Sequence, residues 1–123
     1  MVDRFLAAIE AKDVDAALAL VTDDVSYENV PIDPIVGKDA VGAILRGFLD
    51  PAAEVDWQIL RQHAVDRLVV NERLDRFRIG ERWLELPVAG FFEVTDEGLI
   101  SRWRDYFDMA TYTRQLQALS GSE

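Results

Sequence analysis

Residues 67–79 read RLVVNERLDRFRI, and their apolar and polar side chains alternate along the chain. Alternation with a period of two is typical of a β-strand that has one buried face. The same period predicts three more strands, over residues 55–64, 81–94 and 99–107. Since short turns separate these strands, the C-terminal half is predicted to form an antiparallel meander.

The flanking segments have helical spacing of apolar residues instead. We predict helices over residues 2–11, 15–21 and 38–49, a strand over 25–30, and a last helix that begins near Asp108 and buries Met109, Tyr112, Leu116 and Leu119. This order predicts an α+β fold, in which a curved mixed β-sheet forms a cone with helices packed on its concave side. With 123 residues, the chain is expected to be a single domain, residues 1–123.

The composition restricts the chemistry of the chain. Acidic residues number 23 against 13 basic ones, and the formal net charge of −10 argues against a nucleic-acid partner. The absence of cysteine excludes a disulfide scaffold and a thiol nucleophile. His63 is the only histidine, which is too few nitrogen ligands for a typical catalytic zinc, so no metal site is expected.

Targeting and membrane-spanning segments are not expected either. The first apolar stretch contains acidic residues, unlike a signal peptide, and no run approaches the ~18 apolar residues that a membrane helix needs. We therefore expect a cytoplasmic protein without membrane contact.

Polar side chains interrupt the faces that the alternation predicts to be buried. Arg73 and Asp75 lie among apolar residues on one face of their strand, as does Asp105 on a later strand, and Tyr27 and Asn29 share a face of the first strand. A buried carboxylate must be paired, hydrogen-bonded or protonated. The simplest arrangement is a polar cluster at the bottom of an apolar pocket, with Arg73 bridging Asp75 and Asp105.

Other interpretations of these residues remain open. Arg73 and Asp75 could face solvent on an exposed strand, and Asp105 could cap the helix that follows it. Pro87 lies in a strand that should line the pocket, where proline indicates an edge or a bulge. His63 is expected to have a structural or surface role.

Three motifs resemble the limonene-1,2-epoxide hydrolase family, which has the nuclear-transport-factor-2-like, or SnoaL-like, cone fold. They are YENVP at residues 27–31, ERLD at 72–75 and WRDYFD at 103–108, with a less specific GKDAV segment at 37–41. The resemblance runs through nearly the whole chain in the same order.

The resemblance implies a cofactor-independent enzyme that adds water to an apolar epoxide in one step and gives a vicinal trans-diol. It implies that Asp105 is the general base for a water held by Tyr27 and Asn29, that Asp75 is the general acid, and that Arg73 bridges the two acids. Two acids in opposite protonation states supply what epoxide opening needs, a nucleophile on carbon and a proton on oxygen. By position, the residues of the apolar substrate-binding wall are Phe77, Leu86, Val88, Trp103 and Tyr112. The family's habit also implies a homodimer.

Two other functions on the same fold stay open. A ketosteroid-isomerase-like isomerase would need a base and a phenol but no acid–arginine–acid bridge, and a non-catalytic module would only bind a hydrophobic ligand or assemble with partners. Monoterpene epoxides and sterol or lipid epoxides are equally open as substrates.

Overall fold

The computed structural model describes residues 1–30 and 32–119, with the side chain of Leu119 and the motif residue Pro31 outside the described part. Its centre is a six-stranded sheet with the order β2–β1–β6–β5–β4–β3. The strands are β1 (Val21–Val30), β2 (Ile35–Val36), β3 (Glu54–Val65), β4 (Leu68–Ile79), β5 (Arg82–Val94) and β6 (Ile100–Tyr106). The sheet is mixed, since β1 and β6 are parallel and the other neighbouring pairs are antiparallel.

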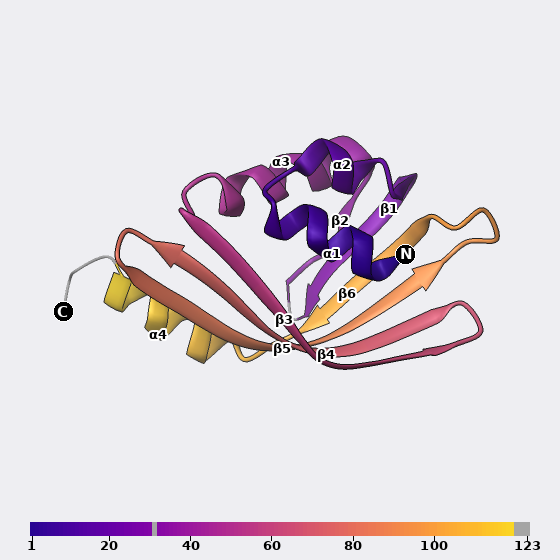
Figure 1. Cartoon of the computed structure of the whole chain (residues 1–123). Helices are drawn as coiled ribbons and strands as arrows, with labels where there is room; N and C mark the ends of the chain where they lie inside the picture. Colours follow the sequence, from indigo (N-terminus) through magenta and orange to yellow (C-terminus); the bar gives the residue numbers. More distant parts are fainter. Residues whose placement is uncertain (31, 120–123) are drawn as a thin grey trace.

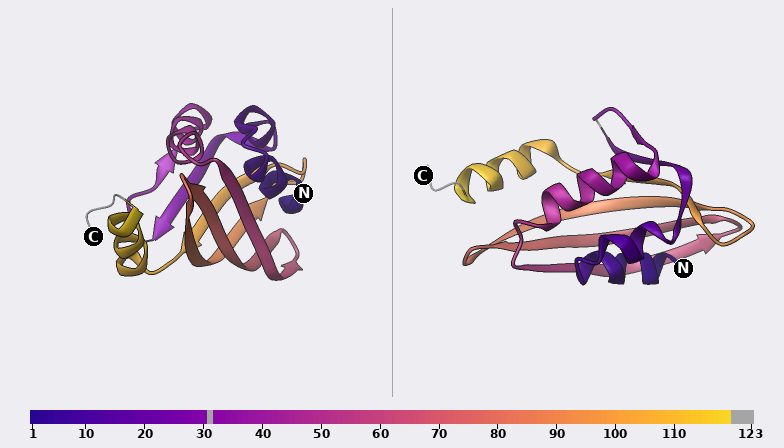
Figure 2. Two further views of the ribbon diagram at one scale, coloured as in Figure 1. Left: turned by 60° about the vertical axis from the view of Figure 1, so that its left-hand side comes forward. Right: turned by 90° about the horizontal axis from the view of Figure 1, so that it is seen from above.

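Four helices accompany the sheet: α1 (Val2–Glu10), α2 (Val14–Leu18), α3 (Lys38–Leu49) and α4 (Met109–Leu119). The sheet is strongly curved, and α1, α2 and α3 lie together over its concave side (Figure 1). The predicted α+β fold, with a curved mixed sheet and helices on the concave side, is therefore confirmed. Figure 2 shows α4 apart from these helices, beside one end of the sheet.

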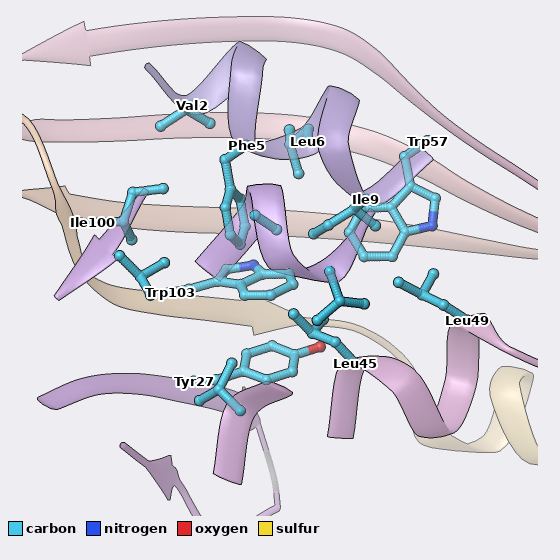
Figure 3. Close-up of a cluster of buried hydrophobic side chains, with 14 of the residues drawn as sticks. Val2, Phe5, Leu6, Ile9, Tyr27, Leu45, Leu49, Trp57, Ile100 and Trp103 are labelled. Carbon is cyan, nitrogen blue, oxygen red and sulfur yellow. The ribbon is translucent and has the colours of Figure 1, made fainter. Parts of the chain in front are cut away.

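Trp103 lies near the centre of the core, between α1 and β1 (Figure 3). Its ring makes an edge contact with Phe5 at 5.1 Å between centroids and stacks on Tyr27 at 3.9 Å. All three side chains are buried. Aromatic packing therefore fixes the positions of β1 and β6 relative to each other, next to the polar residues that these strands carry.

Two predictions about local structure were wrong. Val21 was placed in the second helix, but it begins β1 and pairs with Ile100 of β6, an interaction that helical spacing cannot reveal. The terminal helix was expected to bury its apolar stripe, but Met109 and Tyr112 are only half-buried and Leu116 is exposed. This helix rests on β5 at the end of the sheet, so Tyr112 and Leu116 line a cavity instead of packing into a closed core.

No helix in the described part of the chain is both long enough and apolar enough to span a membrane.

Candidate active site

Alternation along β4 brings Arg73 and Asp75 to the concave face, and β6 brings Asp105 to the same place. Arg73 Nε and Nη2 donate to the two carboxylate oxygens of Asp75, each at 2.9 Å. Arg73 Nη2 also donates to Asp105 Oδ2 at 2.9 Å, so one guanidinium bridges both acids. The other oxygen of Asp105 accepts from Trp103 Nε1 at 2.8 Å. The three charged side chains that the alternation placed on inward faces therefore meet, and the solvent-facing alternative is wrong.

Burial dominates the electrostatics of the two acids. The exposed fractions of Arg73, Asp75 and Asp105 are 1%, 4% and 3%. Burial raises the pKa of Asp75 to about 6, although the Arg73 charge acts in the opposite direction. Burial also raises the pKa of Asp105, against the influence of Arg73 and Trp103. The two carboxyl groups around one cation therefore titrate as a pair and hold a proton to higher pH than a free aspartic acid does.

Tyr27 and Asn29 approach the acids from β1. The parallel register places Tyr27 beside Trp103 and Asn29 beside Asp105. Burial, with the Asp105 charge, raises the pKa of the Tyr27 phenol, while a hydrogen bond with Asn29 acts in the opposite direction. The phenol is therefore a neutral hydrogen-bonding group at ordinary pH.

A cavity of about 460 Å³ opens over these residues between α3, α4 and the sheet. Its polar lining contains Tyr27, Asn29, Asp75 and Asp105. Its apolar lining includes Phe48, Phe77, Leu84, Leu86, Val88 and Tyr112. Four of the five residues predicted for the substrate-binding wall, Phe77, Leu86, Val88 and Tyr112, thus line the cavity.

Trp103 is the exception among the predicted wall residues. It is 1% exposed and is not among the described residues that line the cavity, because Phe5 and Tyr27 enclose its ring. Its indole N–H instead fixes one oxygen of Asp105 from behind. The prediction of a wall contact is therefore corrected to a supporting contact with the candidate base.

The helix cap that Asp105 could have provided is made by another residue. Asp108 accepts from Ala110 N at 3.2 Å and from Thr111 Oγ1 at 2.7 Å, at the start of α4. Asp105 lies three residues earlier, within β6, and its carboxylate faces Arg73.

Sequence reasoning missed two residues that contact the charged bridge. Asn71 shares a strand face with Arg73, and its Oδ1 accepts from Arg73 Nη1 at 3.0 Å. Gly90 of β5 lies in register between Asn71 and Asp105. Alternation was a sufficient signal for Asn71, but the place of Gly90 depends on strand register.

Metal-ligating side chains do not gather elsewhere in the described ranges 1–30 and 32–119, where no group of three or more His, Asp or Glu residues could hold a metal ion. His63 is exposed on β3.

Comparison with known proteins gives this site a family. The model of the limonene-1,2-epoxide hydrolase catalytic domain matches residues 1–118. The chain belongs to the limonene-1,2-epoxide hydrolase family. The chain is 37% identical over 108 residues to epoxide hydrolase EphG of Mycobacterium tuberculosis strain ATCC 25618 / H37Rv. This match covers 88% of the chain and 71% of EphG. Family membership supports hydrolysis of epoxides as the activity of this chain.

Solved structures agree with the family and the fold. The structure of an epoxide hydrolase from M. tuberculosis that is described as LEH-like, that is, like limonene-1,2-epoxide hydrolase, has 35% sequence identity to this chain and a TM-score of 0.80. The match covers 99% of this chain and 93% of the M. tuberculosis chain. A protein from Catenulispora acidiphila with a ketosteroid-isomerase-like fold, in complex with trimethylamine, has a TM-score of 0.81 over 93% of this chain and 89% of its own. Since its identity is 17%, that likeness shows the shared fold alone.

Proposed function

We propose that this chain is a cofactor-independent epoxide hydrolase that adds water to an apolar epoxide in one step and releases a vicinal trans-diol. The observation that carries the proposal is the Asp75–Arg73–Asp105 bridge, buried beside an apolar cavity. Family membership, and the similarity to epoxide hydrolase EphG, support the same reaction class.

Asp105 is the general base in this proposal. Asn29 lies beside it in the β1–β6 register, and Tyr27, Asn29 and Asp105 all line the cavity. A water bound to these three groups would present its oxygen to the epoxide carbon, and holding the water there reduces the entropic part of the barrier. The hydrogen bonds from Arg73 and Trp103 fix the Asp105 carboxylate, so it need not reorganise when it accepts the proton.

Asp75 is the general acid. A carboxyl group with its pKa raised to about 6 can hold a proton near neutral pH and donate it to the epoxide oxygen. As the water oxygen bonds to one epoxide carbon, the C–O bond to that carbon breaks. The water proton goes to Asp105, and the Asp75 proton goes to the new hydroxyl group. The pair therefore keeps one proton throughout, on Asp75 before the step and on Asp105 after it. Exchange with solvent then restores the proton to Asp75.

The cavity lining supports an apolar substrate. The walls from β4, β5, α3 and α4 are mostly apolar, and the polar lining includes Tyr27, Asn29 and the two acids, with Asp33 from the segment between β1 and β2. An apolar epoxide would therefore bury its hydrocarbon part and place its oxygen toward Asp75. Monoterpene epoxides and sterol or lipid epoxides both match this chemistry.

The isomerase alternative is weaker for one structural reason. A base and a phenol suffice for proton transfer on an enone, whereas here a second acid is tied to the base through Arg73. The same buried acids argue against a module that only binds hydrophobic ligands, because burying charged groups without a catalytic use is unfavourable.

We also propose a cytoplasmic homodimer, as the family resemblance implies. Leu60 and Tyr106, exposed by 58% and 41%, are candidate apolar contacts. Sedimentation equilibrium would test the dimer, and a monomer at micromolar concentration would contradict it.

The central experiment replaces each acid. Asp105→Asn and Asp75→Asn should each lower kcat/KM for a small and a bulky epoxide by about 10²–10⁴-fold, because each removes a proton-transfer role. Circular dichroism should show an unchanged fold. Asp24→Asn, which changes an exposed carboxyl group of β1, is the matched control and should retain wild-type activity.

Reaction in ¹⁸O-labelled water tests the one-step route. The diol from a single turnover should carry the label, because the attacking oxygen comes from water. An unlabelled first product would point to an enzyme carboxylate as the nucleophile and overturn the mechanism.

For the two asparagine variants, retention of most activity in either one would overturn the roles assigned to Asp105 and Asp75.

A further inference from the structure

The Arg73 guanidinium has a third side-chain partner besides the two acids. Asn71 lies two residues earlier on the same face of β4, is 2% exposed, and accepts from Arg73 Nη1 through its Oδ1 at 3.0 Å. This contact holds the nitrogen that neither acid engages, since Nε and Nη2 serve Asp75 and Asp105.

The orientation of the Asn71 amide is fixed from the other side. Arginine only donates hydrogen bonds, so the Asn71 carbonyl must face Arg73 and its NH₂ group must turn away. That NH₂ group donates to Gln62 Oε1 at 3.0 Å. Gln62 lies on β3, directly opposite Asn71 in the β3–β4 register. Gln62 Nε2 in turn donates to Asp3 Oδ1 at 2.8 Å. The chain of donors and acceptors thus has one direction from Arg73 to the surface of α1.

Gly90 leaves the space in which these groups meet. In the β4–β5–β6 register, Asn71 lies opposite Gly90, and Gly90 lies opposite Asp105. A Cβ atom on Gly90 would overlap Arg73 Nη1 and lie only 2.8 Å from Asn71 Oδ1 and 2.9 Å from Asp105 Oδ1. The amide, the guanidinium and the carboxylate therefore converge over a backbone that carries no side chain.

We infer that Asn71 is a positioning residue that holds the Arg73 guanidinium in the plane where it spans Asp75 and Asp105. The inference rests on the proposed hydrolysis, because positioning matters only if the two acids act on substrate. A neutral amide suits this place, since it accepts a hydrogen bond from Arg73 without adding a third negative charge to the pair. Among the described residues, Glu10 of α1 also raises the pKa of Asp75, and the charges of both acids raise the pKa of Tyr27 of β1.

Two substitutions separate positioning from mere structural support. Asn71→Ala removes the hydrogen bond and should lower kcat about tenfold, as expected for ~1.4 kcal/mol, with KM changed less than about twofold. Asn71→Asp keeps the acceptor but adds charge, and should shift both limbs of the kcat/KM profile upward by about one pH unit. Asp24→Asn, which changes an exposed carboxyl group of β1 outside this network, is the control and should leave the profile limbs in place.

Carboxyl-carbon NMR of ¹³C-labelled aspartate gives a readout that does not depend on turnover. In Asn71→Asp, the titration of Asp75 and Asp105 should move to higher pH, while that of exposed Asp24 should not. If the wild-type chain opens no epoxide, the proposed function fails, and the NMR titration still tests the place of Asn71. The inference would be overturned if Asp75 and Asp105 titrate as in the wild type in Asn71→Asp and folded Asn71→Ala keeps the wild-type kcat. If Asn71→Ala does not fold, unshifted titration and pH limbs in folded Asn71→Asp would overturn it.

Discussion

Arg73 carries its charge in the interior because each nitrogen of its guanidinium donates at least one hydrogen bond. Four hydrogen bonds reach Asp75, Asp105 and Asn71, and the Trp57 ring lies 5.1 Å from its central carbon. Removing one partner from such a group leaves a buried charge without compensation, which typically costs about 3–5 kcal/mol. Local stability and the geometry of the proposed site therefore depend on the same few atoms.

Gly90→Ala should therefore destroy activity while changing few other contacts. The new methyl group would overlap Arg73 Nη1 and shift the guanidinium relative to both acids, so we expect kcat/KM to fall at least about 100-fold, with a stability loss of about 1–3 kcal/mol from overpacking. Steady-state kinetics and urea unfolding would measure the two effects.

Gly47→Ala on α3 is the control for stability. No atom lies within 4 Å of a Cβ atom built at Gly47, so helix propensity should stabilise this variant by about 0.5–1 kcal/mol. A Gly90→Ala enzyme with near wild-type kcat/KM would contradict the account of the site.

At the scale of elements, the backbone near the start of β5 is hydrogen-bonded by a side chain of α4. The register of β6 with β5 covers residues 89–94, so the preceding part of β5 has a locally free edge, as the position of Pro87 indicated. Gln115 of α4 covers that edge: its Oε1 accepts from Glu85 N at 2.7 Å, and its Nε2 donates to Glu85 O at 2.6 Å. The amide thus imitates a neighbouring strand and holds Tyr112 and Leu116 at the cavity.

Gln115→Ala should loosen this helix. Loss of two hydrogen bonds, worth about 1 kcal/mol each at most on the surface, should raise KM for a bulky epoxide severalfold. For a small epoxide that does not reach Tyr112 and Leu116, KM should change less than about twofold. The exposed Thr113→Ala on the same helix is the control. An equal rise in KM for both substrates would exclude a selective role for α4.

At the scale of the whole molecule, the buried acids oppose the surface carboxylates in their effect on stability. Burial raises the pKa of Asp75 to about 6, so between about pH 4 and pH 6 the folded chain binds a proton that the unfolded chain has released. Stability from this group is present at lower pH and is lost as the pH rises through 6. Hydrogen bonds from Gln58 and Arg76 lower the pKa of Asp56, so its contribution is lost on acidification.

We therefore expect stability to be maximal near about pH 4, where the Asp75 contribution is still present, and to fall as the pH rises through about 6. The net charge of −10 acts in the same direction, because acidification reduces self-repulsion. Urea unfolding measured from about pH 4 to pH 7 should show that the free energy of unfolding falls as the pH rises. In Asp75→Asn the fall should be shallower, since one of the two buried carboxyl groups no longer titrates. Parallel curves for the two proteins would refute the linkage.

The sequence could predict the site because alternation is a local property of an extended backbone. Side chains two residues apart share a face, so the faces of Arg73, Asp75, Tyr27 and Asn29 followed from counting along each strand. The same counting fails where a strand is irregular: two-residue steps back from Trp103 lead to Leu99, but a register shift near Val94 buries Ile100 instead. A bulge changes the face without any signal that counting detects.

The sequence alone thus determined which side chains share a strand face, because backbone geometry acts over two residues. Only the tertiary structure decided which faces meet and how closely. The convergence over Gly90, the enclosure of Trp103 between Phe5 and Tyr27, and the half-buried position of α4 all depend on register and packing between segments far apart in the chain. These contacts form only when the whole sheet is assembled, and no local pattern encodes them.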